Sequence, residues 1–311
     1  MLHPQARTLL DFIEQRGVPP THTLTPDDAR RFYRERRFFT QPDAPPVAIV
    51  RELQAPGPGG AIPLRLYRPQ AGDAPLPALV YFHGGGWTIG DLDTHDTLCR
   101  QLANASGCIV VAVDYRMGPE HRFPAAVDDS LAALHWVHAQ APALGIDASR
   151  IAVGGDSAGG NLAAVAAIHA RDHGGPPLAF QLLIYPATDM RCGMPSHQTN
   201  GQGYLLTSET IRYFHDHYID DPADDHDWRA SPLLHEDLSR LPPAFLLTAG
   251  YDPLRDEGLA YAQRLSEAGN RATSICFERQ IHGFITMGRV IDEANAAVDL
   301  CAAQLRSALS A

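Results

Sequence analysis

The sequence predicts an α/β protein with a mainly parallel sheet covered by helices on both faces. From residue 47 onward, short runs of aliphatic and β-branched residues alternate with helix-like stretches, and this alternation is typical of parallel sheets. The chain has 311 residues, of which 45% are hydrophobic. A chain of this length and composition can bury a large core without disulfide bonds.

The expected elements follow one another in a regular order. We expect strands at Ile62–Tyr67, Ala78–His83, Cys108–Asp114, Ile151–Gly154, Ala179–Tyr185, Ala244–Ala249 and Thr273–Phe277. Helices are expected at Ala125–Gln140, Ala158–Arg171, Asp256–Ala268 and near Asp292–Ala308. In the first of these helices Val127, Leu131 and Leu134 share one face, as a helix packed on a sheet requires.

Two regions interrupt this order. We expect residues 1–46 to begin with helix, and their later part is rich in proline. Residues 187–235 are rich in Gly, Asp and His, with one expected helix at Ser208–Tyr218. Insertions of this kind in a compact α/β domain often form lids over a site. The acidic run between Asp220 and Asp227 lacks the spacing of a calcium loop and contains Pro222, so we interpret it as a solvated turn.

Composition excludes several classes of protein. Acidic residues outnumber basic ones 36 to 25, every basic residue is arginine, and the net charge is −11, which argues against nucleic-acid binding. No signal peptide or membrane-spanning stretch is apparent, so we expect a cytoplasmic protein without stable membrane association. The five cysteines are scattered without metal-ligand spacing, and we expect free thiols and no metal site.

The most informative motif is Gly155-Asp156-Ser157-Ala158-Gly159, which follows an apolar strand and begins an alanine-rich helix. A serine on such a tight strand-to-helix turn projects its oxygen outward, and only small neighbours leave room for it. Ser157 is therefore the candidate nucleophile.

A second glycine-rich motif, His83-Gly84-Gly85-Gly86-Trp87, lies at the end of the strand Ala78–Phe82. Consecutive glycines allow several backbone N–H groups to point at one oxygen, which is what an oxyanion requires. We predict the amides of Gly84, Gly85 and Ala158 as donors. We expect His83 to orient the loop, and a phosphate-binding loop is excluded by the missing GxGxxG and lysine.

A serine hydroxyl needs a base, and an acid to orient that base. His282 follows a strand and precedes the last helix, and the expected chain order in such folds is Ser, acid, His. Asp252 follows the strand Ala244–Ala249 and is the candidate acid. Asp256 is its rival, although it also suits the first turn of the following helix.

Together these motifs resemble the hormone-sensitive-lipase family of bacterial carboxylesterases. The resemblance covers about residues 45–305 and depends on HGGGW at His83–Trp87, GDSAGG at Gly155–Gly160, YDPLRDEG at Tyr251–Gly258 and HGF at His282–Phe284. Met117-Gly118 stands where the family usually has Leu-Ala, a departure in a structural turn.

The resemblance implies an α/β-hydrolase fold with an eight-stranded, mostly parallel sheet and a helical cap. Residues 1–46 and 187–235 would form the cap, and residues 47–186 and 236–311 the catalytic domain. It also implies hydrolysis of short- to medium-chain acyl esters through an acyl-enzyme, without a metal or organic cofactor, by a monomer or homodimer. Trp87, Leu206 and Phe214 are candidate walls of the substrate pocket.

Three other functions remain open at this stage. An amidase or other acyl-transfer hydrolase would use the same triad. A small-molecule receptor on the same scaffold would lack the base histidine, whereas His282 is present. An interfacial lipase is disfavoured because no amphipathic membrane helix is evident.

Overall fold

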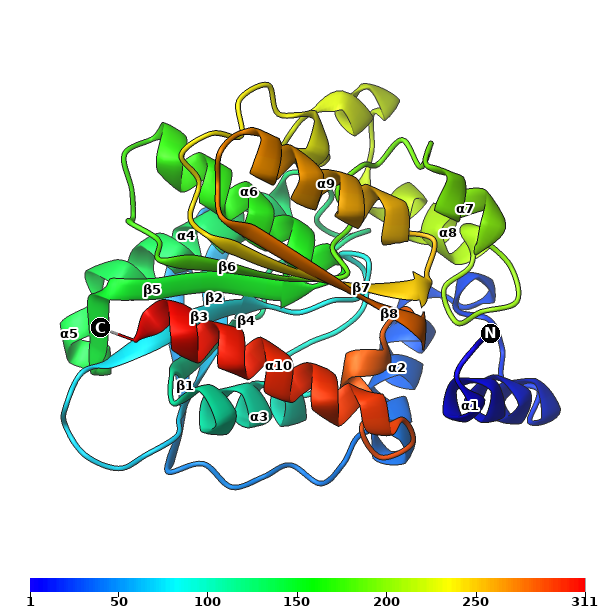
Figure 1. Ribbon diagram of the computed structural model, residues 1–311, viewed down its shortest axis with the longest axis horizontal. Coiled ribbons are helices and arrows are strands. Elements are labelled where there is room, and N and C mark those ends of the chain that lie inside the picture. Colours follow the sequence, from blue (N-terminus) through cyan, green and yellow to red (C-terminus); the bar gives the residue numbers. More distant parts are fainter. Residues whose placement is uncertain (311) are drawn as a thin grey trace.

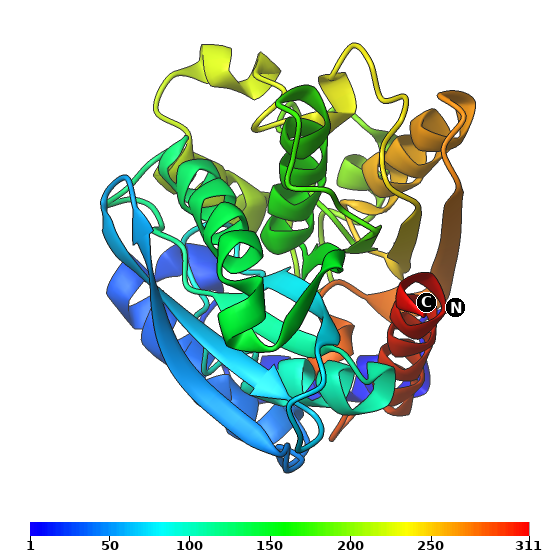
Figure 2. The same ribbon diagram turned by 90° about the vertical axis from the view of Figure 1, so that its left-hand side faces the viewer.

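An eight-stranded twisted sheet forms the centre of the computed structural model, which describes residues 1–310 (Figures 1 and 2). The strand order is β1-β2-β4-β3-β5-β6-β7-β8. The strands are β1 (Ile49–Gly57), β2 (Gly60–Arg68), β3 (Leu76–Phe82), β4 (Ile109–Val113), β5 (Ile146–Asp156), β6 (Phe180–Ile184), β7 (Ala244–Tyr251) and β8 (Ala272–Ile281). β1 and β2 pair antiparallel, β2 also pairs antiparallel with β4, and all other pairs are parallel.

Helices cover both faces of the sheet. On one face lie α3 (Asp96–Ser106) and α10 (Asp292–Leu309), and on the other α4 (Ala125–Ala139), α6 (Ala158–Asp172) and α9 (Arg255–Glu267) (Figure 1). Each face has its own core, and along β3 Leu79 and Tyr81 belong to one core while Val80 and Phe82 belong to the other. Because β4 and β6 are buried at every residue, the central strands appear in the sequence as continuous aliphatic runs.

The two regions outside the strand–helix order lie side by side (Figure 1). The N-terminal region contains α1 (Pro4–Gln15), a 3₁₀ turn at Thr21–Thr23 and α2 (Pro26–Thr40); the later one contains α7 (Pro195–Thr199), α8 (Ser208–Tyr218) and 3₁₀ turns at Pro222–His226 and Pro232–Leu234. α2 and α8 each begin after a threonine that caps the helix, Thr25 and Thr207. His22 contacts the Thr210 hydroxyl at 3.3 Å and so links the two regions.

The predicted fold class is confirmed, and the longest of the elements that were not expected within the catalytic domain are β1 and α3. β1 was not expected because most of its residues are exposed and it carries no continuous apolar run. α3 was not expected because it mixes Asp96, Arg100 and Gln101 with its buried leucines. The short helix α5 (Ala141–Leu144) and a 3₁₀ turn at Phe284–Thr286 complete the described elements.

Within residues 1–310, no helix is long and apolar enough to cross a membrane. In the same residues, no group of three or more His, Cys, Asp or Glu side chains is arranged to hold a metal ion.

Candidate active site

Ser157 lies between the end of β5 and the first residue of α6, in a strained backbone conformation (φ 57°, ψ −118°). The turn is tight because a side chain on Gly159 would collide with the backbone oxygen of Phe82. The Ser157 amide donates to the Ile184 carbonyl (2.9 Å), which ties the turn to the neighbouring strand. The hydroxyl therefore points into a cavity above the carboxyl ends of the parallel strands.

His282 joins Ser157 to Asp252. Its Nε2 lies 2.9 Å from Ser157 Oγ, and its Nδ1 lies 2.7 Å from Asp252 Oδ2. Asp252 is fully buried, and its Oδ1 accepts the Leu254 amide (2.8 Å). A carboxylate at Nδ1 places the ring proton there, so Nε2 is free to accept the serine proton.

The structure separates the two candidate acids. Asp256 accepts hydrogen bonds from the Ser196 amide (2.9 Å) and from Arg255 Nε (2.8 Å), and His282 is bonded to Asp252 instead. Sequence reasoning missed Asn200, whose side-chain amide donates to the backbone oxygens of Gly250 and Asp252 (3.2 and 3.1 Å) and so holds the Asp252 loop.

The prediction for the glycine-rich loop needs one correction. The Gly84 amide donates to Asp156 Oδ1 at 3.0 Å, and a donor already bonded to a carboxylate is not available to an oxyanion. Gly85 and Gly86 line the cavity beside Ser157. Among residues 1–310, no hydrogen-bond acceptor is found for the amides of Gly85, Gly86 and Ala158.

Asp156 explains why Gly84 is used this way. Its carboxylate is buried and accepts hydrogen bonds from Tyr81 Oη (2.7 Å), Gly84 N (3.0 Å) and His95 Nε2 (3.3 Å). Burial alone would raise the pKa of this carboxyl, but His95 and the other donors outweigh burial and lower it. Asp156 is thus an ionised anchor beneath the glycine-rich loop, a role that sequence reasoning did not assign.

His83 is placed as an orienting residue should be. It is buried, its Nδ1 lies 2.9 Å from the Gly84 carbonyl oxygen, and its ring stacks on Tyr115. Burial lowers the pKa of His83 to about 4, so the neutral ring donates Nδ1–H to that oxygen at neutral pH.

The cavity above Ser157 has a volume of about 120 Å³. The three predicted wall residues, Trp87, Leu206 and Phe214, all line it, and Trp87 also stacks on Tyr218 with ring centroids 4.5 Å apart. Further lining residues, which sequence reasoning missed, are Thr21, Tyr33, Arg36, Asp189, Met190, Cys192, Ile211, Leu254 and Glu257. Many of these come from residues 1–46 and 187–235, where no motif indicated a position.

Comparisons with known proteins identify the family of this chain. The family described as alpha/beta hydrolase fold matches residues 79–286, and the chain belongs to this family. Within it, the chain is of the hormone-sensitive-lipase type, as the motifs indicated.

Sequence similarity to known esterases extends over nearly the whole chain. It is 42% identical over 304 residues to the ethyl acetate hydrolase of Pseudomonas putida, covering 94% of this chain and 95% of the relative. It is 44% identical over 314 residues to the carboxylesterase NlhH of Mycobacterium tuberculosis, covering 100% and 97% of the two chains. A solved esterase of Pyrobaculum calidifontis superposes with a TM-score of 0.91 at 40% identity, covering 100% of both chains. A solved α/β-hydrolase enzyme from the metagenome of Lake Arreo, Spain, superposes with a TM-score of 0.95 at 44% identity, covering 99% of this chain and 98% of the other.

Proposed function

We propose that the protein is a serine carboxylesterase that hydrolyses short- to medium-chain acyl esters through an acyl-enzyme. The observation that carries this proposal is the continuous hydrogen-bonded chain from Ser157 through His282 to the buried carboxylate of Asp252. It opens onto a cavity lined by two consecutive glycines. Nucleophile, base, orienting acid and oxyanion donors are the components that acyl transfer requires.

The first half of the reaction makes the acyl-enzyme. His282 Nε2 takes the hydroxyl proton as Ser157 Oγ attacks the ester carbonyl carbon, and Asp252 stabilises the imidazolium that forms. The amides of Gly85, Gly86 and Ala158 stabilise the negative charge on the former carbonyl oxygen. When the tetrahedral intermediate collapses, the C–O bond to the alcohol breaks and His282 gives its proton to the leaving oxygen.

The second half regenerates the serine. His282 takes a proton from water, which attacks the acyl carbon; the bond to Ser157 Oγ then breaks and the serine recovers its proton from His282. In this proposal residues 1–46 and 187–235 act as a cap that walls the cavity and excludes bulk water.

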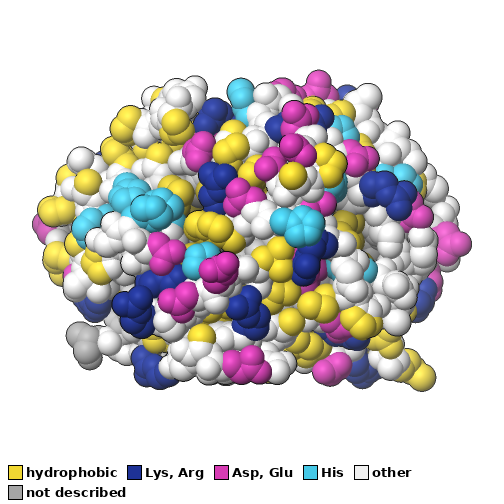
Figure 3. Space-filling view, turned by 90° about the horizontal axis from the view of Figure 1, so that it is seen from above, with side chains coloured by type: hydrophobic (Ala, Val, Ile, Leu, Met, Phe, Trp, Pro, Cys, Tyr) yellow, Lys and Arg dark blue, Asp and Glu magenta, His cyan; other side chains and the backbone are white. Residues whose placement is uncertain are grey.

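The cavity and the charge distribution support a small, uncharged substrate. A volume of about 120 Å³ is similar to that of engineered cavities of about 150 Å³ that hold benzene. Figure 3 shows acidic and arginine side chains interspersed over the outer face, so the net charge of −11 is not gathered into one acidic area on the visible face. The ethyl acetate hydrolase among the relatives acts on a short ester by name, consistent with this proposal.

The test uses the variant Ser157→Ala and a p-nitrophenyl acyl ester. We expect turnover to be lost while the circular dichroism spectrum is unchanged, and a fluorophosphonate probe to label the parent at Ser157 only. Ser274→Ala, which alters an exposed serine on β8, is the matched control and should behave like the parent. Near-normal turnover by the Ser157 variant would refute the assignment. Anilide substrates of the same acyl length decide between esterase and amidase.

A further inference from the structure

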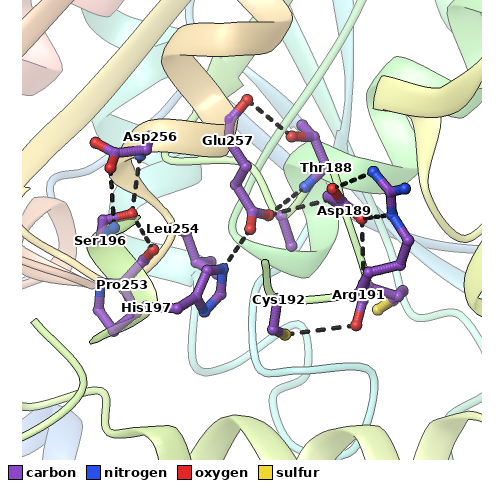
Figure 4. Close-up of polar contacts among 12 residues, drawn as sticks. Thr188, Asp189, Arg191, Cys192, Ser196, His197, Pro253, Leu254, Asp256 and Glu257 are labelled. Atoms are coloured by element: carbon purple, nitrogen blue, oxygen red, sulfur yellow. Dashed lines mark hydrogen bonds and ion pairs between the residues drawn. The ribbon is translucent and has the colours of Figure 1, made fainter. Parts of the chain in front are cut away.

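A second group of titratable side chains lies on the wall of the same cavity, and the proposed ester hydrolysis does not use it. Cys192, His197 and Glu257 meet where the segment after β6, the helix α7 and the first turn of α9 come together (Figure 4). Cys192 and Glu257 line the cavity that contains Ser157. Figure 4 shows the His197 ring directed at Glu257, with the Cys192 sulfur on its other side.

The Glu257 side chain is held in one position. Burial raises the pKa of its carboxyl, and His197 and two backbone amides act against this effect. Its side chain is 1% exposed, and its oxygens accept hydrogen bonds from the amides of Thr188 (2.7 Å) and Asp189 (3.3 Å). The remaining partner is His197, whose Nε2 lies 2.6 Å from Glu257 Oε2. The carboxylate therefore holds the imidazole in one orientation.

His197 carries a positive charge at neutral pH. Burial alone would lower the pKa of His197, but its contacts with Cys192 and Glu257 outweigh burial and raise it to about 10. His197 Nε2 is bonded to Glu257, so the side of the ring that is turned away from Glu257 is the side on which the Cys192 side chain lies. A positively charged ring in this position stabilises the negative charge that a cysteine sulfur carries when it acts as a nucleophile.

Cys192 is accessible and is held in place. It is half-buried, in a left-handed backbone conformation (φ 52°) that is uncommon for residues other than glycine. The turn is fixed by the Asp189 carboxylate, which accepts three hydrogen bonds from Arg191. The donors are its backbone amide (3.1 Å), its Nε (2.8 Å) and its Nη2 (2.8 Å). The thiol lies 3.4 Å from the Met190 carbonyl oxygen.

The other cysteines offer no comparable site. Cys99, Cys108 and Cys301 are at most 1% exposed, and burial raises the pKa of each thiol. Cys276 is partly exposed on β8, but it does not line the cavity.

We propose that Cys192, supported by the His197–Glu257 pair, is a second reactive site that takes small, uncharged Michael acceptors, and that its alkylation blocks ester hydrolysis at Ser157. The second clause rests on the proposed function. A cavity that admits an ester carbonyl also admits an α,β-unsaturated carbonyl of similar size. The walls near Cys192 include Met190 and Leu254, which favour an uncharged reagent.

The covalent step needs no further reactant. The thiol proton passes to water, and the imidazolium of His197 stabilises the thiolate. The sulfur attacks the β-carbon and forms a C–S bond while the C=C π pair moves toward the carbonyl as an enolate. The α-carbon then takes a proton from water, so that the net change is addition of S–H across the double bond. The adduct occupies part of a cavity of about 120 Å³, which leaves little room for an ester.

The test exposes the full-length chain to N-ethylmaleimide at pH 7 and follows adducts by peptide mass spectrometry and turnover of a short p-nitrophenyl ester. We expect the Cys192 adduct to form first, with the same rate constant as the loss of activity. Cys192→Ala should keep its own starting activity through the same exposure. Cys276→Ala, the matched control, should be inactivated at the parent rate.

Two further arms test the mechanism. His197→Gln should slow formation of the Cys192 adduct about ten-fold or more, because the variant lacks the positive charge that stabilises the attacking sulfur anion. Prior sulfonylation of Ser157 by phenylmethylsulfonyl fluoride should also slow adduct formation in the unmutated chain, because the two residues share one cavity. The second arm does not depend on the folding of a variant.

Each contrary outcome overturns a defined part of the proposal. First labelling at Cys276, or unchanged labelling in His197→Gln, refutes the reactive site. A Cys192 adduct without loss of activity refutes the block. Labelling of Cys192 in Ser157→Ala at the parent rate separates this site from the proposed esterase function, because mass spectrometry reads it without any turnover.

Discussion

Arg30, on the N-terminal helix α2, holds together two loops beside the catalytic cavity. Its Nε donates to the Thr88 carbonyl oxygen (2.9 Å), and its Nη2 donates to that of Gly118 (2.8 Å). Both nitrogens of the fork also contact the Glu120 carboxylate (2.8 and 2.6 Å). Thr88 follows the loop that carries Gly85 and Gly86, so we predict that Arg30→Ala loosens the oxyanion donors.

The magnitude follows from these contacts. A hydrogen bond from a charged donor contributes about 1.5–3 kcal/mol; water replaces part of this when the side chain is removed. The Glu120 carboxylate is 52% exposed, so its ion pair adds less than about 1 kcal/mol. We expect Arg30→Ala to lower the free energy of unfolding by about 2–4 kcal/mol. We expect Arg30→Lys to recover at most half of this, since an ammonium cannot reproduce the planar fork.

Urea unfolding and steady-state kinetics measure the two effects. Loss of one oxyanion donor costs about 10²–10³ in kcat, so a loosened loop should cost less, about ten-fold, with little change in KM. Arg31→Ala is the matched control, because Arg31 is 70% exposed and pairs with Asp28 (2.8 Å) on the same helix; we expect less than about 0.5 kcal/mol. An unchanged kcat in a destabilised Arg30 variant would show that the loop keeps its position without the guanidinium.

Three further predictions address the site and its surroundings. Asp252→Asn should lower kcat by about 10⁴-fold in a p-nitrophenyl ester assay, because an amide does not stabilise the imidazolium; a loss below ten-fold contradicts the triad. Gly86→Ala should lower kcat by about 10²-fold, since Gly86 has φ +57° and an added methyl group collides with the Phe214 ring, whereas Gly193→Ala meets open space and should match the parent. Cys192 and Glu257 raise the pKa of His197 to about 10 from the model-peptide value of 6.5, so the favourable interactions of the protonated ring stabilise the fold fully below pH 6.5 and progressively less up to pH 10. In urea unfolding, the free energy of unfolding of His197→Gln should be lower than that of the parent, and this difference should become smaller between pH 6 and pH 10. A difference that stays constant over this range contradicts the ion pair.

Much of the fold and of the candidate triad could be predicted because the relevant signals are local. Buried parallel strands appear as aliphatic runs, and the Gly155–Gly159 turn needs small residues at fixed spacing. The rival acids Asp252 and Asp256 were distinguished by hydrogen bonds: His282 is bonded to the first, and the Ser196 amide to the second. Chain order could only rank them.

The predictions that failed or were missing depend on contacts between distant segments. The sequence does not distinguish Gly84 from Gly86, because both belong to one run of glycines. The Asp156 carboxylate, which lies 72 residues from Gly84 in the sequence, accepts the Gly84 amide and so removes it from the set of oxyanion donors. β1 was missed because an exposed edge strand carries no apolar run.

The sequence by itself determined the fold class and indicated the candidate nucleophile and its candidate base, because short motifs encode the strained turn and the strand ends that hold them. Only the tertiary structure decided which glycine amides remain free, how residues 1–46 and 187–235 wall the cavity, and that Cys192 lines the same cavity as Glu257, the partner of His197. These features depend on hydrogen bonds and ion pairs between segments that are far apart in the sequence. A local sequence pattern does not indicate which of these segments will come into contact.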